Sequence, residues 1–278
     1  MKSYAPPPRT VGRLERPFGT LYYEVCGSGP ALLFAHGLGG NHLSWWQQLA
    51  HFAPHYTCVA FAHRGFAPSD AITDGPDPAD YAGDLAALID HLALTDVRLV
   101  GQSMGGWTML EYALTHPEKV KALVLSSTSG TLDRRGSDPS GGRDYDAWMK
   151  DAEAKVVDGM AKGIHPAVGA SAAARWPALH LLYRSIDEMA GALDKAKLRD
   201  GLRRTATRTF ADLATFRVPT LLIAGGEDVV FPAFLASAIA ARLPCGEAEI
   251  ISDSGHSPYF EQAARFNELV DAFLVRQR

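Results

Sequence analysis

Residues 101–105, which read Gly-Gln-Ser-Met-Gly, contain the strongest candidate for a chemically active side chain. They follow an apolar run at residues 97–100 that is typical of a buried strand, and a helical pattern begins at Gly105. A tight strand-to-helix turn of the form G-x-S-x-G, the nucleophile elbow, holds its serine in strained backbone geometry and lifts the hydroxyl above the sheet. The position of the motif therefore predicts that Ser103 is a nucleophile.

A serine hydroxyl is a weak nucleophile until a base takes its proton, and His256 is the best candidate for that base. It lies between the last strand-like run and the C-terminal helical pattern. Asp228, which follows the preceding strand-like run, is the candidate for the carboxylate that orients the imidazole. The chain order Ser103, Asp228, His256 is the order that accompanies a nucleophile elbow. Glu227 and Asp133 remain alternatives for the acid.

Attack of a serine on a carbonyl group also requires two hydrogen-bond donors for the oxyanion that forms. The elbow supplies one of them, the backbone N–H of Met104, at the start of a helix. The second is predicted to be the N–H of Leu38, in the glycine-rich loop 36–41. This loop does not match a dinucleotide-binding motif, because His42 stands where that motif needs a glycine. His36 is expected to brace the loop.

The elements that must position these residues alternate along the chain between strand-like and helical patterns. Two hairpin-like runs cover residues 11–16 and 20–26. The strand-like runs after them are 31–35, 58–62, 97–100, 122–125, 220–224 and 248–251, and the helical patterns are 43–52, 79–94, 105–115, 232–243 and 258–276. Strands that are apolar at consecutive positions and separated by helices predict an α/β fold, with a mostly parallel central sheet flanked by helices.

The alternation is interrupted between residues 125 and 220. A polar stretch at 126–142 opens this interval, and helical patterns follow at 147–163, 174–186, 188–201 and 202–216. The sheet pattern is complete without them. We therefore predict one core domain formed by residues 1–129 and 209–278, with a helical insertion at 130–208.

Composition and charge exclude several classes of protein. With 27 Lys and Arg against 31 Asp and Glu, the net charge of −4 provides no positive field to attract nucleic acid. The 3 cysteines are far apart, which indicates a reducing compartment, and no zinc, phosphate-loop or calcium motif occurs, so neither a metal nor a cofactor is expected. Without a signal-like leader or a long apolar stretch, the protein is expected to be cytoplasmic and to have no membrane partner.

From residue 20 to residue 274 the chain resembles the α/β-hydrolase superfamily. The motifs that carry the resemblance are 36–39 (His-Gly-Leu-Gly), 63–65 (His-Arg-Gly), 101–106 (Gly-Gln-Ser-Met-Gly-Gly), 226–228 (Gly-Glu-Asp) and 255–258 (Gly-His-Ser-Pro). The resemblance implies an α/β-hydrolase fold in which the insertion is a helical lid. A serine at 103, where haloalkane dehalogenases and epoxide hydrolases have aspartate, makes the chain similar to the capped esterases, enol-lactonases and C–C hydrolases. Ser257 weakens the last branch, in which a tryptophan commonly follows the histidine.

The resemblance implies a serine hydrolase that cleaves a small to medium, largely apolar carboxylic ester or lactone through an acyl-enzyme. Two alternatives remain, namely a hydrolase of C–C bonds in diketone-type substrates and a non-hydrolytic ligand-binding member of the fold. The expected partner is a small-molecule substrate, and the expected state is a monomer or a homodimer.

The residues expected to contact the substrate form two groups. Those at the rim of the site are Asn41, His42 and Gln102. Those of the insertion, whose aromatic rings are expected to line the site, are Trp148, Trp176 and Tyr183. For the second group, packing between the lid helices is an equally good interpretation of the pattern.

Overall fold

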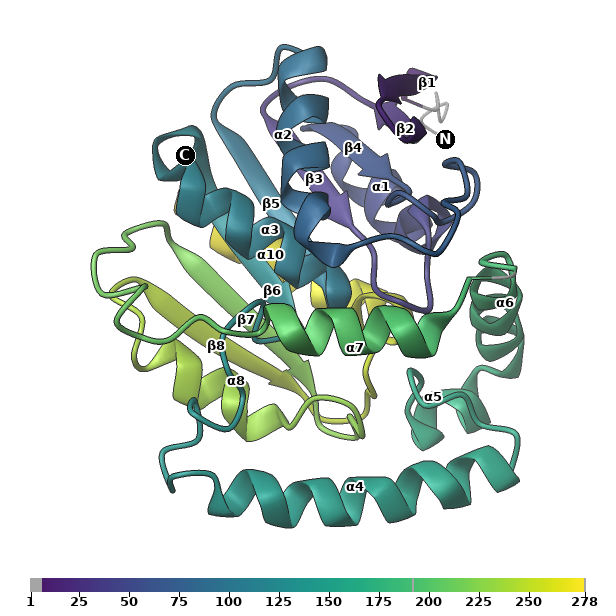
Figure 1. Ribbon diagram of the computed structural model, residues 1–278, viewed down its shortest axis with the longest axis vertical. Helices are drawn as coiled ribbons and strands as arrows, with labels where there is room; N and C mark the ends of the chain where they lie inside the picture. The colour runs from purple at the N-terminus through teal and green to yellow at the C-terminus, as the bar shows by residue number, and fades with distance from the viewer. Residues whose placement is uncertain (1–6, 192, 278) are drawn as a thin grey trace, which may run out of the picture.

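Runs of consecutive apolar residues form the central strands of an eight-stranded sheet in the computed structural model, which describes residues 7–191 and 193–277 (Figure 1). The strands are β1 (Arg9–Arg16), β2 (Gly19–Cys26), β3 (Ala31–Ala35), β4 (Thr57–Phe61), β5 (Val97–Gln102), β6 (Val120–Ser126), β7 (Thr220–Gly225) and β8 (Gly246–Ile251). Their order across the sheet is β1-β2-β4-β3-β5-β6-β7-β8. The pairs β1–β2 and β2–β4 are antiparallel and the remaining pairs are parallel, which confirms the predicted fold class.

Helices that precede and follow the insertion in the chain cover this sheet. They are α1 (Trp46–Phe52), α2 (Tyr81–His91), α3 (Met104–Thr115), α8 (Ala233–Ala240), α9 (Pro258–Glu261) and α10 (Ala263–Val275). Short 3-10 turns accompany them at η1 (His42–Trp45), η2 (Pro78–Asp80) and η3 (Pro117–Lys119). Two helices predicted as continuous are divided. The pattern at 43–52 forms η1 and α1, and the pattern at 258–276 is broken at Gln262, whose φ of −124° is not helical.

Alternate residues of each central strand point to opposite faces of the sheet, and each face has its own apolar core. In β3, Leu33 and Ala35 belong to the core that α2, α3 and α8 complete. Leu32 and Phe34 belong to the core that α1 and α10 complete. Because helices cover both faces, the carboxyl ends of the parallel strands are the edge at which loops can form a site.

The helical insertion, residues 130–208, lies between β6 and β7 in the chain. It contains α4 (Arg143–Ala161), α5 (Ala170–Arg175), α6 (Pro177–Glu188) and α7 (Lys195–Thr205). An isolated parallel bridge between Leu132 and Arg208 joins its two ends. Figure 1 shows α7 passing across the end of α3, whereas α4 lies apart from the sheet. Of the 19 residues of α4, all of which the structure describes, Ala152 alone is buried.

The prediction of a helix at residues 202–216 is wrong. Helix α7 ends at Thr205, and the backbone beyond it runs beside the start of the insertion. There the N–H of Arg208 donates to the carbonyl of Thr131, and its carbonyl accepts from the N–H of Asp133. These long-range hydrogen bonds hold Arg208 in an isolated bridge that a helical periodicity does not reveal, and residues 210–215 beyond it form turns.

Two other predicted helices of the insertion are interrupted. The pattern at 188–201 is broken because Gly191 adopts a φ of 57°, and Asp194 then caps the start of α7 with its side chain. The pattern at 174–186 is divided by Pro177, which lacks an N–H and therefore occupies the first turn of α6.

No helix within residues 7–191 and 193–277 is long and apolar enough to cross a membrane. In this described part of the chain, no group of three or more His, Cys, Asp and Glu side chains is arranged to hold a metal ion.

Helix α3 and strand β3 approach so closely at Gly105 that a Cβ atom there would overlap the carbonyl oxygen of Ala35. We therefore expect Gly105→Ala to lower the free energy of unfolding by about 3 kcal/mol or more, because backbone atoms must move apart to admit the methyl group. Urea unfolding measures this loss. The matched control is Gly83→Ala in α2, where nothing lies within 4 Å of the added atom and a gain of roughly 0.5–1 kcal/mol is expected. Equal effects of the two substitutions would contradict the close approach.

Candidate active site

Ser103 lies in a strained turn between β5 and α3. Its φ of 49° and ψ of −117° are values that a residue with a Cβ rarely adopts. The turn is held because the Ser103 N–H donates to the carbonyl of Ser126 over 3.0 Å. It also requires Gly101, where a Cβ would lie 2.6 Å from the carbonyl oxygen of Gly105. Ser103 is partly exposed, although its neighbours Gln102 and Met104 are buried. The strain therefore presents this serine at the carboxyl edge of the sheet.

The His256 side chain is paired with Asp228. Its Nδ1 atom lies 2.8 Å from Oδ2 and 3.1 Å from Oδ1 of the aspartate, and both side chains are buried. The N–H groups of Val230 and Phe231 donate to the same Oδ1 over 2.7 and 2.8 Å, which fixes the carboxylate. Because a carboxylate accepts hydrogen bonds, Nδ1 carries a proton, and Nε2 is the nitrogen that can act as a base in the neutral ring. This is the tautomer that a general base requires.

The two other candidates for the acid have different partners. The carboxylate of Glu227 accepts hydrogen bonds from the N–H and the hydroxyl of Ser171. The carboxylate of Asp133 accepts from the N–H groups of Arg135 and Gly136, each over 3.1 Å. Glu227 therefore anchors the insertion to the core, and Asp133 stabilises a turn at the start of the insertion. Asp228 is the carboxylate that contacts the histidine.

Gln102 joins the elbow to the loop of His256. Its Nε2 atom donates to the carbonyl oxygen of His256 over 2.8 Å. Its Oε1 atom lies so close to Gly37 that a Cβ at that glycine would overlap it, and the same Cβ would lie 3.2 Å from the Cβ of Ser103. Sequence reasoning assigned Gln102 to the rim of the site. Here the side chain is buried and connects the loops that carry Ser103, His256 and the glycine-rich segment.

The glycine-rich loop is braced by a chain of buried imidazoles. Thr108 Oγ1 lies 2.9 Å from His63 Nε2, and His63 Nδ1 lies 3.1 Å from His36 Nε2. His36 Nδ1 then donates to the carbonyl oxygen of Gly37 over 2.8 Å. Burial lowers the pKa of His36 to about 3 and that of His63 well below its usual range. Both rings are therefore neutral, and each donates with one nitrogen and accepts with the other.

This chain also fixes the direction of the Leu38 N–H. The carbonyl of Gly37 and the N–H of Leu38 belong to one planar peptide and point in opposite directions. A bond that holds the carbonyl therefore holds the N–H as well. The Leu38 side chain packs against an apolar cluster that contains Met104, so the two amides expected to bind an oxyanion belong to adjoining segments.

Asn41 and His42 make structural contacts next to this loop. The Asn41 Oδ1 atom accepts from the Leu43 N–H over 2.8 Å and caps η1, while Nδ2 lies 3.5 Å from the sulfur of Met189. The His42 Nε2 atom lies 3.2 Å from Oε1 of Glu24 in β2. Both side chains are buried.

The three aromatic residues expected from the insertion lie in different surroundings. Tyr183 is buried, stacks edge-on against Phe260, and approaches the glycine-rich loop: a Cβ at Gly39 would lie 2.9 Å from its hydroxyl oxygen. Trp176, between α5 and α6, is 49% exposed. Trp148 lines a cavity of about 600 Å³. Tyr183 is thus the one of the three that closely approaches the candidate oxyanion loop.

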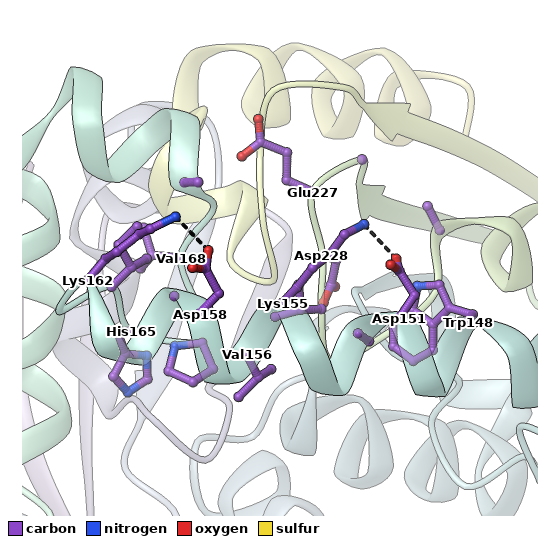
Figure 2. A pocket seen from close by; sticks show the side chains of 18 of the residues that line it. Trp148, Asp151, Lys155, Val156, Asp158, Lys162, His165, Val168, Glu227 and Asp228 are labelled. Atoms are coloured by element: carbon purple, nitrogen blue, oxygen red, sulfur yellow. Dashed lines mark hydrogen bonds and ion pairs between the residues drawn. The ribbon is translucent and has the colours of Figure 1, made fainter.

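The cavity beside Trp148 lies between α4 and the loop after β7 (Figure 2). Figure 2 shows Glu227 and Asp228 on one side and the Lys155–Asp151 and Lys162–Asp158 pairs of α4 on the other. Asp228 is among the residues that line it, but Ser103 and His256 are not. The cavity therefore adjoins the loop of the acid without opening onto the nucleophile.

Helix α7 covers the helix that begins at the elbow. The indole nitrogen of Trp107 in α3 donates to the carbonyl of Leu202 over 3.2 Å. Leu198 and Leu202 of α7 form an apolar cluster with Met104 and Trp107. The insertion thus provides apolar surface beside the elbow through α7.

Sequence reasoning missed Glu261, at the end of α9. Its carboxylate accepts hydrogen bonds from the N–H groups of Gly255, Ser257 and Gly169, over 2.8, 3.0 and 2.9 Å. Burial, together with the nearby charge of Asp228, raises the pKa of Glu261 to about 7. An acidic residue five positions after the histidine was the available signal, but only the folded chain shows what it binds.

Comparison with known proteins agrees with the fold. A family model described as the alpha/beta hydrolase fold matches residues 30–263. The 3-oxoadipate enol-lactonase 2 of Acinetobacter baylyi is 27% identical over 255 residues, which are 89% of this chain and 89% of that protein.

Solved structures show the same architecture. Est816, described as an N-acyl homoserine lactone degrading enzyme, is 25% identical with a TM-score of 0.75, and the match covers 94% of this chain and 100% of that chain. A thermophilic esterase from Thermogutta terrifontis is 22% identical with a TM-score of 0.75, covering 96% of this chain and 99% of that chain. At 22% identity, the similarity to this esterase shows a shared fold.

The raised pKa of Glu261 predicts a pH-dependent stability. Because burial moves this pKa from 4.5 to about 7, the folded protein binds the proton more tightly than the unfolded chain. The resulting stabilisation is fully present below about pH 4.5 and is lost as the pH rises through about 7. Relative to Glu261→Gln, the free energy of unfolding of the wild type should fall by roughly 3 kcal/mol across this interval.

Urea unfolding at stepped pH values measures the difference between wild type and variant. The matched control is Glu268→Gln on the exposed side of α10. A wild-type curve that stays parallel to the Glu261→Gln curve from pH 4.5 to 7 would show that the carboxylate is not held in a buried site.

Proposed function

Because the chain belongs to the family with the alpha/beta hydrolase fold, we propose that it is a serine hydrolase of small to medium, largely apolar carboxylic esters or lactones. The single observation that carries this proposal is the strained turn of Ser103, tied through Gln102 to a histidine that is itself paired with Asp228. Strain at a non-glycine residue costs free energy, so its presence next to Gln102, whose side chain binds the backbone of the candidate base His256, favours a chemical role.

In the proposed acylation step, the Ser103 hydroxyl oxygen attacks the carbonyl carbon while Nε2 of His256 takes the hydroxyl proton. Asp228 holds the ring and stabilises the positive charge that the imidazole gains. The N–H groups of Leu38 and Met104 donate to the oxyanion of the tetrahedral intermediate. As the intermediate collapses, the C–O bond breaks and His256 returns its proton to the leaving alkoxide.

Deacylation repeats these events with water as the nucleophile. His256 takes a proton from the water molecule, whose oxygen attacks the acyl carbon. Collapse of the second tetrahedral intermediate releases the carboxylic acid and restores the Ser103 hydroxyl. In a lactone the alcohol and the acid are parts of the same molecule, so acylation opens the ring and deacylation releases the resulting hydroxy acid.

The proposed substrate class rests on the surroundings of the elbow and on the comparisons. Leu38, Met104 and the α7 residues Leu198 and Leu202 form an apolar cluster beside Ser103, which favours an apolar acyl or alcohol part. The related enol-lactonase and the lactone-degrading Est816 support the choice of ester and lactone substrates. The reacting carbonyl is therefore expected at the elbow and not in the cavity beside α4, which Ser103 does not line.

Ser103→Ala should lower the hydrolysis of an aryl ester by at least about 10³-fold, because the oxyanion donors remain but the covalent route is lost. A fluorophosphonate probe should label the wild type at Ser103 and leave the variant unlabelled. The matched control is Ser185→Ala, an exposed serine of α6, which should retain the wild-type rate.

The outcomes separate the proposed function from other possibilities. Labelling at another serine, or an active Ser103→Ala protein, would contradict the assignment of Ser103 as the nucleophile. If the wild-type protein is labelled but hydrolyses diketone-type C–C bonds in place of esters and lactones, the nucleophile is correct and the proposed reaction is wrong. Protein that is neither labelled nor active on any of these would have to be regarded as a ligand-binding member of the fold.

Asp228→Asn should lower kcat by on the order of 10⁴-fold, because an amide no longer holds the His256 ring in the tautomer with a proton on Nδ1. Steady-state kinetics on the same aryl ester measures the loss. Asp133→Asn is the matched control, since that carboxylate caps a turn at the start of the insertion, and its rate should stay within about threefold of the wild type. If Asp133→Asn lost activity and Asp228→Asn kept it, Asp133 and not Asp228 would be the acid.

A further inference from the structure

The carboxylate of Glu261 has no role in the steps described above, yet it binds the residues on both sides of His256. The N–H of Gly255 donates to its Oε2 atom over 2.8 Å, and the N–H of Ser257 donates to Oε1 over 3.0 Å. Between them, the carbonyl of His256 accepts from Gln102. The backbone that carries the histidine is therefore held at three consecutive residues.

A third donor comes from the helical insertion. The N–H of Gly169, which precedes α5, donates to Oε2 of Glu261 over 2.9 Å. The two loops that share this oxygen also touch directly, because a Cβ at Gly169 would lie 2.7 Å from the nitrogen of Gly255. Neither glycine leaves room for a side chain. Glu261 consequently joins the insertion to the histidine loop through one carboxylate.

Burying a carboxylate costs free energy, and structural stability alone does not require it here. A glutamine side chain has a similar volume and no charge, but only one of its two terminal atoms accepts hydrogen bonds. Three N–H groups donate to the two oxygens, which offsets part of the cost of burying the charge, and they allow little displacement of the loop. Fixing the direction of a general base within a fraction of an ångström is a function that could repay this cost.

We propose that Glu261 is a positioning residue that links the seating of the helical insertion to the orientation of His256. This inference rests on the proposed function, in which His256 is the base. Separation of the insertion from the core at Gly169 would remove one of the three donors and loosen the support of the histidine. The base is then fully aligned only while the insertion is seated.

Glu227 provides a matched control. Its carboxylate also anchors the insertion to the core, through the N–H and hydroxyl of Ser171, but no hydrogen bond joins it to Gly255 or Ser257 in the described residues. If Glu261 acted only as an anchor for the insertion, Glu227→Gln and Glu261→Gln would have similar effects. If it positions His256, the two variants should differ.

The test compares Glu261→Gln, Glu261→Asp and Glu227→Gln in the full chain, with an aryl ester as substrate. Glu261→Gln should lower kcat by about 10- to 100-fold with KM within about threefold, because misalignment of the base affects the chemical step. Glu261→Asp keeps the charge but is too short to reach all three donors, so kcat should fall by about 10-fold or more. Glu227→Gln should keep kcat within about twofold.

Two further measurements report on His256 and on the loops directly. The downfield proton resonance of His256 Nδ1–H should broaden or shift in Glu261→Gln and stay unchanged in Glu227→Gln. Amide hydrogen exchange should accelerate at Gly169, Gly255 and Ser257 together in the first variant, and near Ser171 alone in the second. The Glu261→Asp protein, which retains a carboxylate, provides the kinetic test if Glu261→Gln does not fold.

A folded Glu261→Gln protein with unchanged kcat would overturn the inference, and so would an equal loss of kcat in Glu227→Gln. Exchange that accelerates at Gly169 but not at Gly255 and Ser257 would overturn the link between insertion and histidine loop. These outcomes differ from failure of the proposed function, which would appear as an active Ser103→Ala protein whatever Glu261 does.

Discussion

The close contact between Gly105 and the end of β3 is the constraint on which the candidate site depends. Ala35 is paired with Gly101 across the parallel strands β3 and β5, and the helix after Ser103 must pass over this pair. Only a glycine lets the helix descend far enough. The same contact sets the distance between the serine turn and the glycine-rich loop, because that loop begins one residue after Ala35.

The polar groups around this contact are buried in two different ways. His36 and His63 are neutral and exchange hydrogen bonds, so they brace a loop without introducing charge. Asp228 and Glu261 are carboxylates surrounded by N–H donors, and they hold the histidine from its ring and from its backbone. The neutral relay is inexpensive to bury. Burial of the Glu261 carboxylate lowers stability at neutral pH, and its proposed benefit is the alignment of His256, a compromise that is typical of active sites.

The sequence predicts the sheet and the candidate residues best where the determining interactions are local. The apolar strands, the G-x-S-x-G turn and the order of Ser103, Asp228 and His256 all follow from short patterns with a physical cause. The break at Pro177 has a local cause as well, because a proline can begin a helix but cannot continue one.

Other features depend on contacts between residues far apart in the chain. The extended path at Arg208 is set by pairing with Thr131 and Asp133, and the partners of Gln102 and Glu261 lie on loops that only folding brings together. A single sequence contains no period or motif for such contacts. The weak attachment of α4 has a further consequence. A helix that buries one residue can unfold locally at a small fraction of the global free energy, so proteolysis in the native state should begin there while the sheet remains intact.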